Sequence, residues 1–344
     1  MNNHFFKSVQ ITNFKSLKDV TLSDCKRINL LIGKPNVGKS NILEAIGLFG
    51  LNDDFKLNDF IRVDSLVELF FEGNTKEEIG IKTNDYSIYL SLKKNIKELS
   101  QDLHCLISKQ NLDNPLLGDY TIVDIEVDDK LYISMYYNDE LFEDNVKQYK
   151  FISNFDYHSQ NITNLISPFG GNLFNIIQTL PNLKKEISNL FSDYGLKLVF
   201  DKTSDSLKVM KEISGGAVFL LPYHSIADTL QRVIFFKTAI ASNKDSILLF
   251  EEPEAHCFPP YIAHFTQDVI NSTSNQFFIA THSPYVLNDF LETEETRKEL
   301  AIFIADFKDG QTVINRLTDD EVNEVYDYGI DVFFNYERFT RHDG

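Results

Sequence analysis

The sequence contains no tryptophan and only three cysteines among its 344 residues. Cys25, Cys105 and Cys257 form no C-x-x-C pair, so the sequence predicts neither a disulfide framework nor a zinc site. No run approaches the ~18 apolar residues that a membrane-spanning helix needs, and the first twenty residues contain no apolar signal segment. These absences predict a cytoplasmic protein of the reducing compartment, with no membrane partner.

Basic residues are also scarce. Lys and Arg total 33 against 51 Asp and Glu, which gives a net charge of -18. Because non-specific DNA binding depends on Lys and Arg at the phosphates, this composition disfavours a stand-alone DNA-binding protein. A local basic groove is still compatible with it, so DNA stays an open partner. The length predicts about two domains, since a domain has on the order of 150 residues.

Strands and helices alternate in the last third of the chain. Apolar runs predict buried strands at residues 217–221, 246–250 and 277–280, with helices at 227–242 and 261–271 between them. A short apolar run at 29–32 ends at Gly33, and a helical pattern follows at 41–51. This order predicts an α/β fold whose mixed or parallel core sheet is covered on both faces.

Aromatic and β-branched residues dominate the middle of the chain and predict an antiparallel β layer. The strands expected there are 65–72, 86–92, 120–127 and 130–137, with a two-residue turn at Asp128 and Asp129 and a helix and loop over 93–119. Two helices divided by Pro181 and then a hairpin follow, at 172–180, 182–194, 196–201 and 206–212. The tail predicts strands at 301–305 and 312–316 and a polar helix at 318–327.

The segment GKPNVGKS matches G-x-x-x-x-G-K-[ST] and lies between a predicted strand and a predicted helix. Backbone N–H groups of such a loop bind phosphates at the helix N-terminus, Lys39 reaches the β/γ oxygens, and Ser40 ligates Mg²⁺. The residues expected to bind the cofactor here are Gly33, Lys34, Pro35, Asn36, Val37, Gly38, Lys39, Ser40 and Asn41. A GTPase is disfavoured, because neither D-x-x-G nor N-K-x-D occurs.

Two later strand ends carry matching chemistry. The run SILLFEEPE delivers Glu251 and Glu252 to the carboxyl end of an apolar strand, where ligands bind in open α/β sheets. We expect Glu251 to hold Mg²⁺ and Glu252 to polarise the attacking water. His282 ends the next strand, in FFIATHSP, and there it can contact the γ-phosphate or the water. Lys39, Glu252 and His282 are therefore the predicted catalytic residues.

The opening ITNFKSLKDV, the loop GKPNVGKSN, the strand FEEPEAH and the turn THSP together resemble the ABC-type ATPase heads of the RecF, SMC and OLD group. The resemblance implies a P-loop NTPase fold, ATP with Mg²⁺ as cofactors, and two heads that sandwich ATP. It places Ser225 at the γ-phosphate in trans, although Ile226 and Ala227 replace the signature glycines. It also places Asn13, Phe14 and Lys15 near the adenine.

The resemblance also implies a division of the chain. A discontinuous ATPase core is expected at residues 1–59 and 217–316, an inserted lobe at 60–216 and a helical tail at 317–344. The glutamine expected after the first helix is absent, because no Gln occurs between Ser40 and Gln101. No second carboxylate constellation follows the THSP turn, so the chain is similar to a head without its own nuclease domain.

Short heads of this kind resemble the ATPase subunits of bacterial anti-phage systems, with the PARIS type preferred and the Septu type second. The resemblance implies a slow, regulatory, homo-oligomeric ATPase that controls a separate effector, such as a nuclease or toxin, and answers a phage-encoded trigger protein. A RecF-like repair ATPase that clamps DNA is the main alternative. A transporter ATPase and a nucleotide-locked scaffold without turnover are two others.

Overall fold

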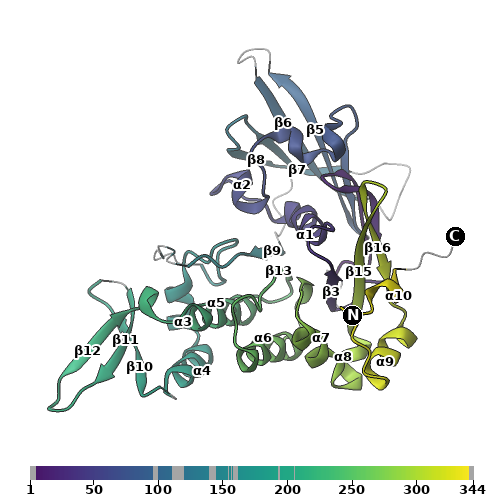
Figure 1. The fold of residues 1–344 in the computed structure, drawn as a ribbon. Helices are drawn as coiled ribbons and strands as arrows, with labels where there is room; N and C mark the ends of the chain where they lie inside the picture. Colours follow the sequence, from purple (N-terminus) through teal and green to yellow (C-terminus); the bar gives the residue numbers. More distant parts are fainter. Residues whose placement is uncertain are drawn as a thin grey trace. The chain divides into compact units, whose positions relative to one another are not determined.

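The computed structural model describes residues 5–95, 100–110, 120–138 and 145–340, except for 154, 156, 158–161, 193 and 205. The chain forms two compact units (Figure 1). The first comprises the chain up to Gln148, the strand segment Ser246–Glu251 and everything from Gln276 onward. The second comprises Tyr149–Asp245 and Glu252–Asn275.

A six-stranded sheet with the order β16-β15-β3-β14-β13-β9 forms the core of the first unit. β3 lies parallel to both of its neighbours, β14 and β15, and β14 lies parallel to β13. The strand bounds are β3 Ile28–Gly33, β9 Val146–Tyr149, β13 Ile247–Glu251, β14 Gln276–Ala280, β15 Leu300–Lys308 and β16 Gln311–Arg316. Every residue of β3 and β14 is buried, as strands covered on both faces must be. The predicted parallel core is confirmed.

The helices of the first unit follow these strands. α1 begins directly after the β3 turn, and α7 begins four residues after β14. The bounds are α1 Lys39–Gly47, α2 Leu57–Phe60, α7 Pro284–Leu291, α8 Glu294–Lys298, α9 Asp319–Asp327 and α10 Tyr336–Phe339. Thr318 and Glu321 form a capping box at the start of α9, which explains why the helix predicted from residue 318 begins there.

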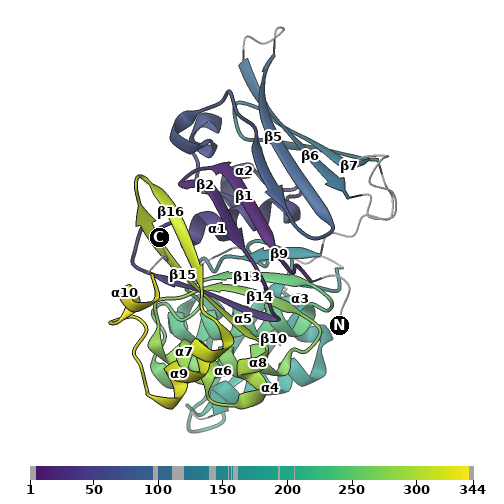
Figure 2. The same ribbon diagram turned by 90° about the vertical axis from the view of Figure 1, so that its right-hand side faces the viewer.

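A second sheet of the first unit is antiparallel throughout and has the order β2-β1-β4-β5-β6-β7-β8 (Figure 2). Its strands are β1 Val9–Phe14, β2 Leu17–Leu22, β4 Ile79–Lys82, β5 Tyr86–Asn95, β6 Ser100–Lys109, β7 Tyr120–Val127 and β8 Ile133–Tyr137. The predicted antiparallel layer is confirmed, but three of its details are wrong.

The strand expected at 65–72 is two short 3₁₀ turns, Leu66–Leu69 and Phe71–Gly73, because the buried Leu66 and Leu69 are spaced three apart rather than two. Within the segment 93–119, expected to be a helix and loop, residues 93–95 and 100–109 are β-structure, and residues 96–99 and 111–119 lie outside the described residues. Polar pairs such as Lys93 opposite Asp102 hid that hairpin from a search for apolar runs. The two-residue turn expected at Asp128 and Asp129 is a longer loop, because the Asp128 carboxylate accepts the N–H groups of Lys130 and Tyr132.

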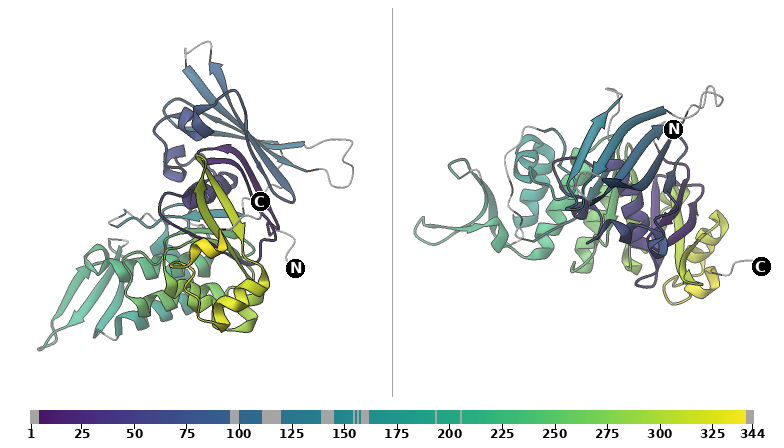
Figure 3. Two further views of the ribbon diagram at one scale, coloured as in Figure 1. Left: turned by 45° about the vertical axis from the view of Figure 1, so that its right-hand side comes forward. Right: turned by 90° about the horizontal axis from the view of Figure 1, so that it is seen from above.

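The second unit contains α3 Leu173–Thr179, α4 Pro181–Ser192, α5 Asp228–Ser242 and α6 Pro259–Asn271, with the sheet β10 Leu196–Asp201, β11 Ser206–Glu212 and β12 Val218–Pro222 (Figure 3). Pro181 begins α4, so the predicted break there is confirmed. The buried strand expected at 217–221 is wrong. β12 pairs antiparallel with β11, and Val218, Phe219 and Leu220 are exposed. An apolar run alone does not distinguish a covered strand from an exposed one.

The N-terminal segment of the first unit is fastened by Gln276, whose side chain is fully buried. Its amide accepts the Phe6 N–H at 2.9 Å and donates to the carbonyls of Phe6 and Lys26, both at 2.8 Å.

Among the described residues, no helix is long and apolar enough to cross a membrane.

We expect Gln276→Ala to lower the free energy of unfolding of the first unit by about 1–3 kcal/mol, because buried backbone groups lose their partners. Urea denaturation measures the change. Gln178→Ala, at an exposed position of α3, is the matched control and should change stability by less than about 0.5 kcal/mol. Equal losses in the two variants would contradict the role of Gln276.

Candidate functional site

The turn between β3 and α1 requires glycine at two positions. Gly38 has φ +97°, and a Cβ there would collide with the Thr312 hydroxyl. A Cβ on Gly33 would collide with the carbonyl oxygen of Ala305 on the neighbouring strand β15. Glycine is the residue that tolerates both the positive φ and the close backbone approach. The loop therefore runs tightly against β15 and β16 before α1 starts.

Lys39 is buried at the start of α1, and its ammonium group turns back into the loop. Its Nζ donates to the carbonyls of Gly33 at 2.9 Å and Lys34 at 2.7 Å. Lys34, Pro35 and Asn36 are exposed at the tip of the loop, while Val37 packs inward. The Lys34 ammonium lies 4.2 Å from the centre of the Tyr336 ring on α10. Hydrogen bonding with the Tyr336 side chain raises the pKa of Lys34, which favours its charged form at the tip of the loop.

The Ser40 hydroxyl, on the first turn of α1, donates to the Glu251 carboxylate at the end of β13. Arg62 Nη2 lies 3.4 Å from the same carboxylate oxygen, with 60% of its side chain exposed. A hydroxyl and a carboxylate are the hard oxygen ligands that Mg²⁺ prefers beside a triphosphate. The chemistry of this pair therefore fits a magnesium ion.

A buried carboxylate behind the loop escaped the sequence analysis. Glu44 on α1 is 1% exposed and accepts from Lys15 Nζ at 2.6 Å, from Arg62 Nε at 2.9 Å and from the Arg62 backbone N–H at 3.1 Å. Burial of an ion makes such paired donors necessary. Arg62 thus connects Glu44 to Glu251. The signal available in the sequence was a lone acid within the apolar helical run NILEAIGLFGL.

The residues expected near the adenine lie together around the β1–β2 turn. Phe14 is fully buried, and Asn13 donates to the carbonyls of Asn74 and Glu77. The Lys15 ammonium also donates to the Arg62 carbonyl. No face of the Phe14 ring is open for stacking in this arrangement.

Asn41 belongs to a short polar chain beside the loop. Its amide donates to Ser16 Oγ at 2.8 Å, and Ser16 Oγ lies 2.7 Å from Thr312 Oγ1 on β16. This series of hydrogen bonds connects α1 to the two sheets of the first unit. Asn41 therefore supports the loop from the side rather than from its tip.

Three parallel strands end at one edge of the core sheet. Glu251 pairs with Ala280 and Ala280 pairs with Leu31, so the ends of β13 and β14 are level, and β3 continues two residues further, to Gly33. His282 follows β14 by two residues and is partly exposed. The Thr281 hydroxyl accepts the Ser283 N–H at 3.0 Å, which shapes the turn that leads into α7. The first unit thus brings together the glycine loop, Ser40, Glu251 and the segment of His282 at one edge.

Glu252 and Ser225 belong to the second unit. Glu252 has φ +44° and begins two overlapping turns, in which the N–H groups of Ala255 and Cys257 bond to the carbonyls of Glu252 and Glu254. Ser225 is exposed and does not cap α5, whose N-cap is Ala227.

The two segments of the second unit that carry these residues are tied together. The Thr229 hydroxyl donates to the carbonyl of His256 at 2.9 Å, and Gln231 holds the 224–226 turn through the His224 and Ile226 carbonyls. The turn around Ser225 and the turn after Glu252 are therefore both hydrogen-bonded to the beginning of α5.

The three thiols are poor nucleophiles. Desolvation by burial raises the pKa of Cys25 to about 12 and also raises the pKa of Cys105 and of Cys257. A thiol reacts as its thiolate, so a raised pKa argues against a nucleophilic role for these three cysteines.

A family model described as "AAA domain, putative AbiEii toxin, Type IV TA system" matches residues 28–288. The Septu protein PtuA of Bacillus mycoides is 25% identical over 317 residues, which cover 84% of this chain and 40% of that protein. The DNA replication and repair protein RecF of Clostridioides difficile is 27% identical over 201 residues, which cover 57% of this chain and 48% of that protein.

Among solved structures, the SmcHead bound to the C-winged helix domain of ScpA matches with a TM-score of 0.53 and 16% identity, over 92% of this chain and 99% of that one. This match confirms the predicted α/β head fold. The chain spans less than half of the length of the curated relatives it matches. Because the family model covers most of the chain, the protein belongs to this AAA family; it is similar in sequence to Septu PtuA and RecF and similar in fold to the SMC head.

Proposed function

We propose that this chain is a regulatory ATPase head that binds ATP with Mg²⁺ and controls a separate effector protein in anti-phage defence. The observation that carries the proposal is the contact between Ser40 and Glu251 beside the glycine loop. The loop N–H groups and Lys39 would bind the phosphates, and Ser40 and Glu251 would hold Mg²⁺. The ion would supply charge neutralisation at the β- and γ-oxygens.

Hydrolysis needs a base on the water and positive charge at the phosphate. Glu252 is the proposed base, because it follows the metal-binding Glu251 by one residue at the end of the same strand segment. His282 would donate a hydrogen bond to the γ-phosphate or orient the water from the adjacent strand end. Arg62 balances the charge of the Glu251 carboxylate and would compete with Mg²⁺ for it.

Ser225 is the proposed residue that reaches the ATP of a second head. Its exposure and its position outside any helix cap leave the hydroxyl available to a partner surface. The Thr229–His256 bond would let the turn after Glu252 respond when that surface closes. The division into a core at 1–59 and 217–316, a lobe at 60–216 and a tail at 317–344 stays part of this proposal, as does contact of the adenine with the turn at residues 13–15, although not by stacking on the buried Phe14.

The defence role draws support from the likeness to PtuA, which extends over 84% of the chain. We therefore place the Septu type before the PARIS type that the sequence alone favoured. The partners in this proposal are a second copy of the chain, a separate effector such as a nuclease, and a phage-encoded trigger protein. A RecF-like repair ATPase is the second candidate, because RecF matches 57% of the chain.

The decisive experiment compares Lys39→Ala with the wild type in ATP binding and in phage plaque assays, with the neighbouring genes present. Loss of charged hydrogen bonds to the phosphates should weaken ATP binding by about 10- to 100-fold and abolish protection. The control Lys18→Ala removes an exposed lysine of β2 and should change neither. Protection that survives Lys39→Ala would contradict an ATP-dependent defence role. Duplex binding that falls steeply with salt would favour repair instead.

We expect Glu252→Gln to lower the hydrolysis rate by about 10²- to 10⁴-fold, because the water loses its general base. ATP affinity should stay within about threefold, and the ATP-bound pair of heads should accumulate in size-exclusion chromatography. Glu254→Gln is the matched control, two residues further along. Unchanged hydrolysis in Glu252→Gln would show that another group is the base.

We expect Arg62→Ala to lower the Mg²⁺ concentration for half-maximal ATP binding by about two- to fivefold, since the guanidinium competes with a cation for Glu251 and an exposed pair is worth up to ~1 kcal/mol. Arg62→Lys should restore the wild-type value. Lys197→Ala, which breaks a similarly exposed pair with Glu212, is the control. A raised Mg²⁺ requirement would contradict the competition.

A further inference from the structure

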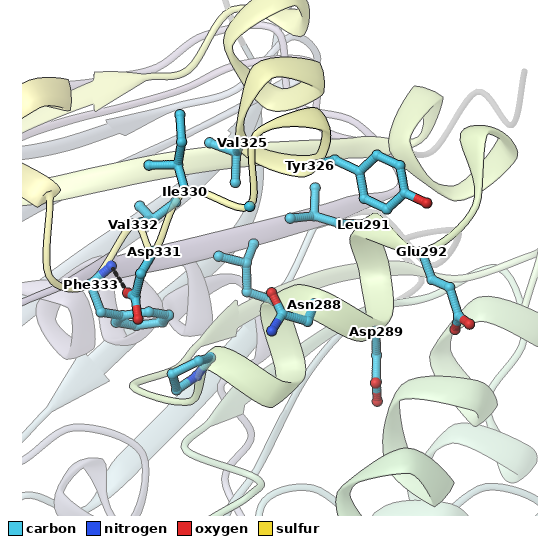
Figure 4. A pocket seen from close by; sticks show the side chains of 13 residues that line it. Asn288, Asp289, Leu291, Glu292, Val325, Tyr326, Ile330, Asp331, Val332 and Phe333 are labelled. Carbon is cyan, nitrogen blue, oxygen red and sulfur yellow. Dashed lines mark hydrogen bonds between the residues drawn. The ribbon is translucent and has the colours of Figure 1, made fainter.

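A pocket of about 550 Å³ lies in the first unit, between α7, α9 and the segment that follows α9 (Figure 4). Its floor is aliphatic, with Leu287 and Leu291 from α7, Val325 from α9 and Val332 from the following loop, and all four are buried. The pocket is separate from the nucleotide loop, although α7 begins two residues after His282. Neither the proposed ATP site nor the head pairing uses it.

The charged groups on the pocket wall all have one sign. Asp289, Glu292 and Asp331 line it, and none of its described lining residues is basic. Figure 4 shows Asp289 and Glu292 on one side and Asp331 on the opposite side of the aliphatic floor. Arg297 lies at the margin, but its guanidinium stacks on Tyr326 at 4.1 Å and its Nη1 donates to the Leu291 carbonyl. The opening is therefore acidic above an apolar base.

Exposed aromatic residues occur in the segments that line the pocket. Tyr326 lines it and is 46% exposed, while Tyr285, Tyr328 and Phe334 each lie next to a lining residue in the sequence and are 57%, 78% and 88% exposed. Aromatic side chains are enriched in protein interfaces, and a contiguous exposed apolar patch marks an interaction site. A small ligand would fill the pocket but leave these rings uncovered, so the occupant is better matched by a protein segment.

The negative charge of the pocket wall indicates which side chains the partner segment should carry. Three carboxylates around an apolar floor repel nucleic acid and anionic lipid, and they attract Lys or Arg. We propose that this pocket docks a segment of a partner protein in which aliphatic anchors alternate with Lys or Arg. The aliphatic side chains enter between α7 and α9, and the basic groups pair with Asp289, Glu292 and Asp331.

The test is a fluorescence-anisotropy titration with a labelled helical peptide in which leucine pairs alternate with arginines. One matched peptide has serine for leucine, and another has glutamate for arginine. The full chain should bind the leucine–arginine peptide at least about tenfold more tightly than either control peptide, and salt should weaken the binding. Equal binding of the serine–arginine peptide, or of the glutamate peptide, would overturn the proposal. So would the absence of binding to the leucine–arginine peptide.

Variants locate the binding. Asp289→Lys with Glu292→Lys should weaken it by at least about tenfold, and Asn288→Trp should block it, because Asn288 is an exposed residue of the pocket wall. Asp53→Lys with Asp54→Lys makes the same change in net charge at exposed positions elsewhere and should leave binding unchanged. An equal loss in this control would show a general charge effect and contradict the pocket. Thermal unfolding and ATP binding, measured on each variant, separate this result from any failure of the proposed nucleotide site.

Discussion

The alignment of three parallel strand ends governs the site. β14 and β13 stop at the same level and β3 runs two residues further, so a loop, a histidine segment and a carboxylate that are far apart in the sequence share one edge of the sheet. The sharp glycine turn then places the first turn of α1 over that edge, and the Ser40 hydroxyl meets Glu251. Strand register fixes the site, because a one-residue slip would turn the side chain at the end of β13 to the other face of the sheet.

The features that could be predicted from the sequence are those with a local cause. The glycine loop, the apolar strands 246–250 and 277–280 and the break at Pro181 depend on short-range backbone geometry or on burial over both faces. The loop and the two strand ends were also recognisable as parts of a nucleotide site, because each carries its own chemistry at a strand terminus.

The features that escaped prediction depend on contacts between distant segments. The polar β5–β6 hairpin is held by cross-strand pairs, which no single run of residues reveals. The exposed strand β12 has the same apolar sequence pattern as a buried strand. Arg62 was missed because its role depends on its ion pairs with Glu44 and Glu251, which lie on two other elements.

Lys39 gives the loop a form of selectivity that follows from its own bonds. Its ammonium group already satisfies two loop carbonyls, at 2.9 and 2.7 Å. An incoming phosphate must therefore replace existing hydrogen bonds, and only the difference between the two sets contributes to affinity. Under the proposed ATP-binding role, a triphosphate would supply several anionic oxygens in exchange for the two carbonyl bonds, whereas a ligand with few anionic oxygens would gain little.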